Sequence, residues 1–314
     1  MLSAGGEVLD VQEPLNVQNR QTILRRRAKH WYSYISAANE WEHLPWYSDA
    51  LEYQIHPIHD IRRARLVSPR GPLRVIEKWT RVVRARRNSQ RILFKDPFAV
   101  FSARWFISRL HCSAVISIRH PAAVVSSLKK LGYTFDFREL LQQETLMRDR
   151  LGPYRVDMQG ACENPDDVVG QGCLLWRIIY GFVARDIAND DHALLVRHED
   201  LSSDPVPRYE EVYARLGLDF NEAARRTIAR FTSDENPSEV FLRRYGSAPL
   251  DSRTSIHSWT KRLTSGEIER IRRETKDVWP EFYAERDWDV RRRARSSVKQ
   301  PDSRANSSVV ARES

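Results

Sequence analysis

The sequence predicts an α/β protein built around a parallel sheet. Three short apolar runs, at residues 91–95, 113–119 and 193–197, have the length and composition of buried strands. The stretches between them carry apolar residues three and four positions apart, which is the spacing of amphipathic helices. Strands that alternate with helices in this way are typical of a parallel sheet covered by helices.

Helices are expected after each of these strands. After the strand at 91–95, residues 98–110 have helical spacing. The strand at 113–119 is followed by His120-Pro121, and proline is favoured at the first position of a helix, so we expect a helix from Pro121 to about Leu131. A long amphipathic helix is expected at 172–187 before the strand at 193–197, with helices at 210–216 and 221–231 after it.

Two regions differ from this pattern. Residues 151–170 contain many loop-forming residues and predict a loop-rich insertion that could lie over a site. Residues 290–314 are rich in arginine and serine without an apolar period, so they predict a disordered tail. Residues 1–289 are then expected to form one domain, and the length of 314 residues is ample for a buried core.

The charge of the chain favours an anionic partner. The sequence holds 51 basic and 42 acidic residues, a net charge of +9, and only eight of the basic residues are lysine. Arginine has a planar, permanently charged fork that suits phosphate and sulfate. A compositional preference for arginine as the surface cation would give the same count, and the charge alone does not distinguish a nucleotide from nucleic acid or an anionic surface.

Composition also argues against several classes of protein. No run of 18 apolar residues occurs, so a transmembrane helix is not expected, and the acidic N-terminal residues do not have the order of a signal peptide. Three cysteines without C-x-x-C spacing fit neither a disulfide framework nor a zinc site, and they favour a reducing, cytoplasmic location. His56-x-x-His59-Asp60 lacks a remote cluster to complete a metal site, so no metal is expected.

Charged residues follow each strand. These strand ends are Glu13-Pro14, Lys95-Asp96-Pro97, Arg119-His120-Pro121 and Arg197-His198-Glu199-Asp200. In parallel α/β sheets, ligands bind beyond the carboxyl ends of the strands. Several converging cations there would form an anion site, although each could instead pair with a nearby carboxylate.

Arg119 and the helix after it have the parts of a phosphate site. Ser126 and Ser127 lie along that helix, and six residues at the helical rise place Ser127 only ~9 Å from Pro121. A strand-end arginine, a helix N-terminus and a hydroxyl can together hold a phosphate. The alternative is that Arg119 pairs with a carboxylate and that the serines belong to an ordinary helix surface.

Residues 95–133, KDPFAVFSARWFISRLHCSAVISIRHPAAVVSSLKKLGY, resemble the central segment of sulfotransferases that use 3′-phosphoadenosine-5′-phosphosulfate (PAPS). That family has an R-x7-S motif, matched here by Arg119 and Ser127, and the KDPFA wording is similar to its bacterial type. VRHEDL at 196–201 with Asp204-Pro205, and Ser252-Arg253 through Trp259 to Leu263, follow in the family's order. The resemblance spans about residues 7 to 289.

The N-terminus departs from the family pattern. Family members begin with a strand and a loop of the type G-x-x-R-S-G-T-T-W, which cradles the 5′-phosphosulfate as a P-loop cradles phosphate. This sequence contains no such loop, and its opening residues look like the end of the next helix, a strand and the family's E-P-L-N. The resemblance therefore implies a P-loop-NTPase-like three-layer sandwich that lacks its first strand and loop, and we expect the chain to be truncated.

The resemblance also implies residue roles. Glu13 would be the general base that takes the proton of the acceptor, and Lys95 would stabilise charge on the leaving oxygen. Arg119 and Ser127 would hold the 3′-phosphate of the co-substrate PAPS, with Arg253 as a further ligand. Glu13 could instead cap a helix or pair with an arginine, and Lys95 could pair with Asp96 or Glu199. His120 and His198 are alternative bases, and Trp259 could simply pack in the core.

Three functions follow as hypotheses. The first is a sulfotransferase acting on a hydroxyl or amine of a glycan, lipid or small molecule. The second is an inactive protein of that fold, since the phosphosulfate loop is missing. The third is a nucleic-acid-binding protein, favoured by the net charge and the arginine-rich tail. A further mixture of basic and aromatic residues could also bind nucleic acid or could form a helical surface beside an acceptor site; it comprises Arg25–Arg27, Trp31, Tyr32, Tyr34, Trp46, Arg62, Arg63 and Arg65. In the family this region lines the acceptor pocket, and no nucleic-acid motif accompanies it here.

Overall fold

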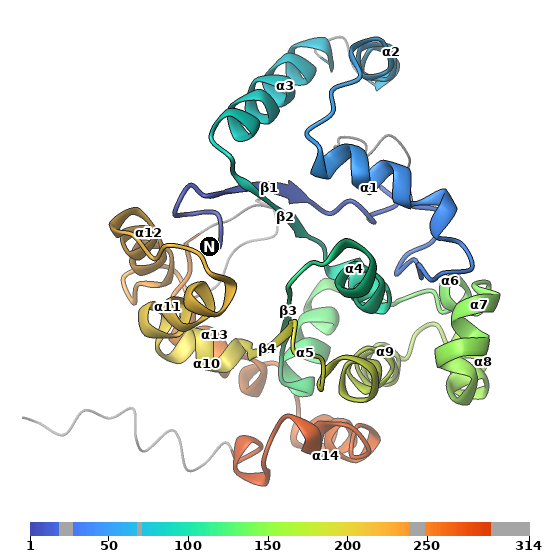
Figure 1. Ribbon diagram of the computed structural model, residues 1–314. Helices are drawn as coiled ribbons and strands as arrows, with labels where there is room; N and C mark the ends of the chain where they lie inside the picture. Colours follow the sequence, from blue (N-terminus) through green and yellow to red (C-terminus); the bar gives the residue numbers. More distant parts are fainter. Residues whose placement is uncertain (19–27, 68–70, 239–248, 290–314) are drawn as a thin grey trace, which may run out of the picture. The chain divides into compact units, whose positions relative to one another are not determined.

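A computed structural model describes residues 1–18, 28–67, 71–238 and 249–289 of the chain (Figure 1). The chain divides into two units, residues 1–282 and 283–314. In the second unit, residues 283–289 are described and include the 3-10 turn Glu285–Asp287. The tail that we expected at 290–314 lies outside the described residues.

The described residues of the first unit form four strands and a series of helices, with these bounds. The strands are β1 (Val8–Gln12), β2 (Arg91–Lys95), β3 (Ala114–Ile118) and β4 (Ala193–Arg197). The α-helices are α1 (Leu44–Leu51), α2 (Pro57–Val67), α3 (Gly71–Arg87), α4 (Ala103–Leu110), α5 (Pro121–Leu131), α6 (Arg138–Leu141), α7 (Glu144–Leu146), α8 (Arg155–Glu163), α9 (Val168–Phe182), α10 (His198–Ser203), α11 (Pro205–Leu216), α12 (Glu222–Thr232), α13 (Ser252–Ile256) and α14 (Ser265–Glu274). Short 3-10 or π turns lie at Glu40–Glu42, Pro97–Ser102, Met147–Leu151, Gly152–Tyr154, Val183–Ile187, Ser258–Lys261 and Trp279–Glu281.

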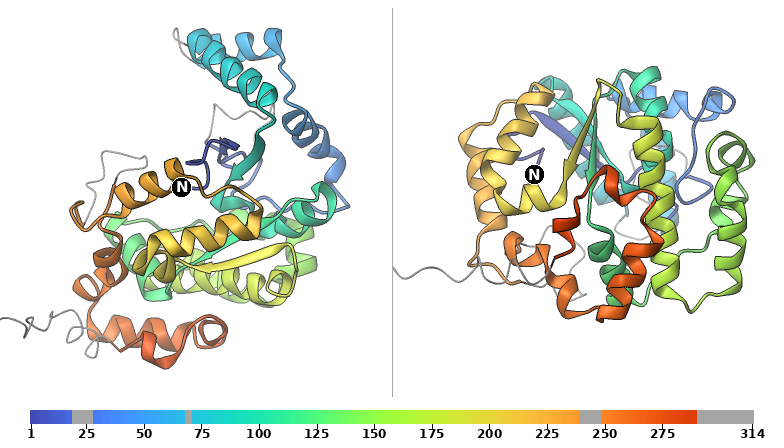
Figure 2. Two further views of the ribbon diagram at one scale, coloured as in Figure 1. Left: turned by 60° about the vertical axis from the view of Figure 1, so that its left-hand side comes forward. Right: turned by 90° about the horizontal axis from the view of Figure 1, so that it is seen from below.

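The described strands form two parallel pairs. β1 lies beside β2 in a register that joins Val8 to Arg91 and Gln12 to Lys95. β3 lies beside β4, and Figure 2 shows this pair from two further directions. The α/β class and the parallel pairing are therefore confirmed, whereas the four strands make two separate two-stranded sheets instead of the single central sheet that we expected.

The strands are less buried than those of most parallel sheets. Every residue of β4 is partly exposed, and Ser117 in β3 is exposed. Parallel strands are usually covered on both faces by helices. Two side chains of α9 satisfy backbone carbonyls at the end of β3: the Tyr180 hydroxyl donates to Ser117 O at 3.2 Å, and Trp176 Nε1 donates to Arg119 O at 2.9 Å.

Helix α9 is the centre of the largest core. It packs against α5 and α14, and its buried residues contact the segment that runs from Phe135 to Met158. The fully buried members of this core include Leu140, Leu146, Met147, Leu151, Met158, Ile178 and Val183. A second core joins α1 and α4 through Tyr47, Trp105 and Phe106. The apolar residues at helical spacing thus face inward, as the pattern predicted.

The expected loop at residues 151–170 is wrong, because this segment is mostly helical. It contains the turn Gly152–Tyr154, helix α8 and the start of α9. Leu151, Tyr154 and Met158 are 0%, 7% and 0% exposed and belong to the main core. Their spacing of three and four is itself a helical signal. The pairs Gly152-Pro153 and Asn164-Pro165 are typical of turns and led to the prediction of a loop.

Smaller differences between the expected and observed elements occur at the N-terminus and at two helix starts. Residues 1–6 form turns, with Ala4 N donating to Met1 O, and are not the end of a helix. The helix expected at 98–110 is a 3-10 segment followed by α4. Helix α9 begins four residues early because Asp167 caps it by accepting from Gly170 N.

Strands β2 and β4 have the bounds that we expected, and α5 ends at Leu131 as expected. Within the described ranges, no helix has both the length and the apolar character needed to cross a bilayer.

Candidate functional site

The carboxyl ends of β1 and β2 bring Glu13 and Lys95 together. The register sets Gln12 beside Lys95, so Glu13 follows at the same end of the pair. Lys95 Nζ donates to Glu13 Oε1 over 3.5 Å, and the two side chains are 55% and 31% exposed. The partner of Lys95 in this ion pair is thus Glu13 across the strand pair, and both groups remain open to a ligand.

The backbone of Glu13 is held in an unusual conformation. Its φ is +46°, in the left-handed region that residues other than glycine seldom adopt. Glu13 N donates to Lys95 O at 2.8 Å, and Asn16 Nδ2 donates to Glu13 Oε2 at 2.7 Å. Such conformations persist only where the surroundings fix them, and they occur often at functional sites.

Asp96 joins the two strand ends. Its Oδ2 accepts from Leu15 N at 2.5 Å and its Oδ1 accepts from Phe98 N at 2.8 Å. Burial raises the pKa of Asp96 to about 6, and the charge of Glu13 adds to that rise, while the two N–H groups and Lys95 oppose it. Sequence reasoning treated Asp96 only as a possible ion-pair partner, although aspartate before proline is a common start of a helical turn.

Arg119 lies between β3 and α5, with its backbone fixed from α9. Trp176 Nε1 donates to Arg119 O, and the next residue, His120, donates its backbone N–H to Glu199 Oε1 at 2.9 Å. A carboxylate of the chain itself therefore caps the first turn of α5. Glu199 follows β4, so the ends of β3 and β4 meet at this point.

Ser127 and Arg253 occupy different surroundings. Ser127 is partly buried in α5, and within the described residues its hydroxyl makes no hydrogen bond. Arg253 lies in the first turn of α13, is exposed, and donates from Nε to Ser203 O at the end of α10 over 3.0 Å. Arg119 thus precedes the helix that holds Ser127, whereas Arg253 is hydrogen-bonded to the end of α10.

Two buried tyrosines have charged residues of the strand ends among their neighbours. Burial raises the pKa of Tyr32, and the nearby groups Tyr133, Tyr180 and Asp96 raise it further. Burial also raises the pKa of Tyr180 to about 12, with Glu199 adding to the rise and Arg119 opposing it. Tyr32 therefore has Asp96 and Tyr180 among its neighbours, and Tyr180 has Arg119 and Glu199 among its own. Tyr133 and Tyr180 were missed in the sequence because neither stands in a motif.

The two histidines that follow strands are both enclosed. His120 is 3% exposed, and its ring stacks on Trp259 at 5.3 Å between centroids, with 11° between the planes. Trp259 is itself 3% exposed, so it packs in the interior. Burial lowers the pKa of His198, Arg119 lowers it further, and Glu199 raises it. Neither ring is placed as openly as the carboxylate of Glu13.

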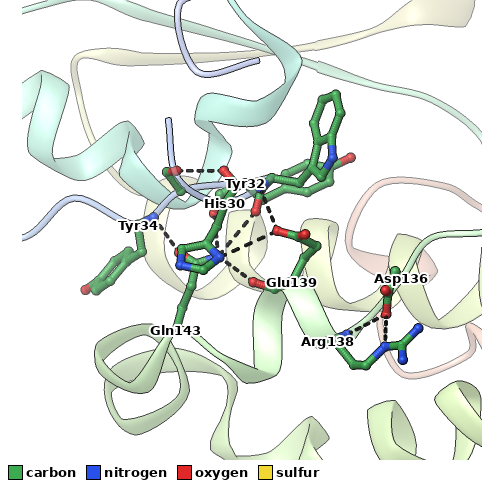
Figure 3. A network of polar contacts seen from close by, with 9 residues as sticks. His30, Tyr32, Tyr34, Asp136, Arg138, Glu139 and Gln143 are labelled. Carbon is green, nitrogen blue, oxygen red and sulfur yellow. Dashed lines mark hydrogen bonds and ion pairs between the residues drawn. The ribbon is translucent and has the colours of Figure 1, made fainter. Parts of the chain in front are cut away.

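The aromatic segment before α1 is tied to helix α6 (Figure 3). Gln143 accepts from Tyr34 N at 3.0 Å and donates to Trp31 O, Tyr32 O and Glu139 O. His30 lies 3.5 Å from Glu139 in an ion pair. These bonds hold Tyr32 against Phe98 and Phe135, at 5.3 and 5.5 Å between ring centroids. The basic run Arg25–Arg27 and the side chains of Arg63 and Arg65 lie outside the described residues.

A pocket lies elsewhere, between α8, α9 and α14. It has a volume of 530 Å³ and is lined by residues that include Asp157, Gln171, Arg177, Glu274 and Asp277. Arg177 pairs there with Asp157 and Asp277. None of the residues predicted from the sequence lines this pocket. His56 and His59 face Asp49 and Asp60, and the described residues contain no group of three or more metal-ligating side chains.

Comparisons with protein-family models, with curated proteins and with solved structures gave no significant match for this chain.

Proposed function

We propose that this chain is a sulfotransferase that moves a sulfuryl group from PAPS to a hydroxyl or amine of a glycan, lipid or small-molecule acceptor. The observation that carries the proposal is the Glu13–Lys95 pair at adjacent strand ends, with Arg119 just before α5 and Ser127 within it. Ligands of parallel α/β proteins bind at such ends. The sequence resemblance in 95–133 supplies the chemistry that these residues would serve.

Glu13 and Lys95 would act on the two sides of the transferred group. The acceptor oxygen forms a bond to sulfur while the bond from sulfur to the phosphate oxygen breaks. The acceptor proton passes to Glu13, and the electron pair of the broken bond stays on the phosphate oxygen. Lys95 stabilises that growing negative charge. The pair is exposed enough for both ligands to reach it.

Arg119 and Ser127 would hold the 3′-phosphate of PAPS. Arginine suits a phosphate because its fork donates two parallel hydrogen bonds, and the Ser127 hydroxyl is not used by a described residue. Arg253 is the less supported ligand, since its Nε already donates to Ser203 O. The negative charge of Glu199, which accepts from His120 N just before α5, would repel the 3′-phosphate.

Binding of 3′-phosphoadenosine 5′-phosphate to Arg119→Ala tests the phosphate site. We expect the dissociation constant to rise by ~10–150-fold in calorimetry, because each lost charge-assisted bond is worth ~1.5–3 kcal/mol. Adenosine 5′-monophosphate, which lacks the 3′-phosphate, should bind equally to wild type and variant. Arg226→Ala, which removes an exposed arginine from α12, is the control for net charge. Equal affinity of wild type and Arg119→Ala for the bisphosphate would show that the site is wrong.

Glu199→Gln should tighten the binding of the same nucleotide. Glutamine can still accept the bond from His120 N but carries no charge, so one repulsion near Arg119 is removed. We expect the affinity to rise by ~3–10-fold, about 1 kcal/mol, which is the energy of two unit charges about 4 Å apart in water. The gain should shrink between 50 and 500 mM salt because added ions screen the charge. An unchanged affinity at low salt would mean that the phosphate binds away from Glu199.

A further inference from the structure

Asp96 is the feature of the site that the proposed roles leave unexplained. It is a mostly buried carboxylate whose two oxygens each accept a backbone N–H, one from Leu15 in the turn after β1 and one from Phe98 after β2. Leu15 is 2% exposed, so its N–H cannot turn to water if the acceptor is lost. Asp96 therefore joins two segments that are 81 residues apart in the chain.

The bond to Leu15 acts on Glu13 through a very short turn. Glu13 stands two residues before Leu15 and has the left-handed φ of +46°. The turn is closed by Asn16 N donating to Glu13 O at 3.2 Å. With Leu15 held by Asp96 and Glu13 N held by Lys95 O, both ends of the strained residue are attached to the end of β2. A strained conformation of this kind needs such support to persist.

We propose that Asp96, as an ionised carboxylate, is the positioning residue that holds Glu13 beside Lys95 in the geometry required for sulfuryl transfer. The proposal rests on the function proposed above for Glu13 and Lys95. Asp96 does not touch the reacting atoms, since its oxygens are used by Leu15 and Phe98. It acts on the base through the backbone.

The charge state of Asp96 makes the arrangement dependent on pH. Its pKa of about 6 is set chiefly by burial. The groups that face it are Glu13 and Lys95 from the strand ends, Tyr32 from the segment before α1, and Tyr47 from α1. Because the pKa in the folded chain is above the ordinary aspartate value of 3.8, the folded chain binds more protons than the unfolded chain between about pH 4 and 6. Ionisation of Asp96 therefore costs stability as the pH rises through that window. A buried charge kept at this cost is typical of a functional site.

Amide hydrogen exchange by NMR tests the role without an activity assay. In Asp96→Asn, one N–H must face the amide nitrogen instead of an oxygen, so Glu13 and Leu15 N–H should exchange at least ~10-fold faster. The control is Asp190→Asn. Like Asp96, Asp190 accepts the backbone N–H of the residue two positions later, His192, but it lies before the start of β4. In wild type, the protection of Glu13 and Leu15 should fall between pH 7 and 5, after correction for intrinsic rates, and Asp96→Asn should show no such change.

The strand amides of β3 and β4 report whether each variant is folded. Unchanged protection of Glu13 in a folded Asp96→Asn variant, or a protection in wild type that does not depend on pH between 7 and 5, would overturn the proposal. The affinity for 3′-phosphoadenosine 5′-phosphate should stay within about twofold in both variants, because Arg119, just before α5, and Ser127, within it, are not in the segments that Asp96 joins. If wild type does not bind this nucleotide, the proposed function fails, while the exchange result still decides whether Asp96 holds Glu13.

Discussion

Glu13→Gln is expected to lower the turnover of sulfuryl transfer by ~10²–10⁴-fold, which is the usual contribution of a general base. Glutamine keeps the shape of the side chain and can still accept the bond from Asn16 Nδ2, so the strained turn should persist. It cannot take a proton at neutral pH. The affinity for 3′-phosphoadenosine 5′-phosphate should remain within about twofold, since that nucleotide is held from α5.

The measurement is the release of 3′-phosphoadenosine 5′-phosphate from PAPS with a panel of phenolic, glycan and lipid acceptors. Lys95→Met should also lower turnover, and Lys95→Arg should restore part of it, because a cation returns near the leaving oxygen. Glu222→Gln, on the exposed surface of α12, serves as the control for a lost carboxylate. A Glu13→Gln variant that turns over within threefold of wild type would assign the base to another residue.

The local elements of this fold could be predicted because each has a signal within a few residues. Strands β2 and β4 are short apolar runs ended by charged residues, and α5 begins at a proline and ends just before Gly132, whose φ is +58°. The first residues of the helices were harder to predict than the strands. A capping bond, such as the one that Gly170 N donates to Asp167 Oδ1, extends a helix beyond its apolar pattern. The segment 151–170 was misread because turn residues interrupt a helical spacing that the main core nevertheless buries.

The arrangement of the site was harder to predict than its members. Glu13, Lys95 and Arg119 stand out in the sequence because each ends a strand, yet the bonds that hold them come from distant residues. Asp96 reaches Leu15, and Trp176 reaches Arg119 O, across 81 and 57 positions of the chain. No local pattern records such contacts. The grouping of the strands into two separate pairs was missed for the same reason.

Trp176→Ala is expected to have the largest effect on stability, lowering the free energy of unfolding by ~3–5 kcal/mol. Trp176 is 1% exposed in α9, and its ring lies 4.9 Å from that of Tyr180. Truncation leaves a cavity beneath β3 and removes the donor to Arg119 O. Urea unfolding followed by circular dichroism measures the loss.

Trp176→Phe separates packing from the hydrogen bond. Phenylalanine fills most of the space but cannot donate, so Arg119 O loses its partner at a cost of ~1–3 kcal/mol. The matched control is Trp279→Phe, which removes an equivalent bond from an indole to the carbonyl of Arg272 at 3.2 Å. Both variants should lose comparable stability, but only Trp176→Phe should weaken the binding of 3′-phosphoadenosine 5′-phosphate, because Trp176, unlike Trp279, donates to the backbone of Arg119. Equal nucleotide affinity in the two variants would mean that Trp176 stabilises the core without positioning the phosphate site.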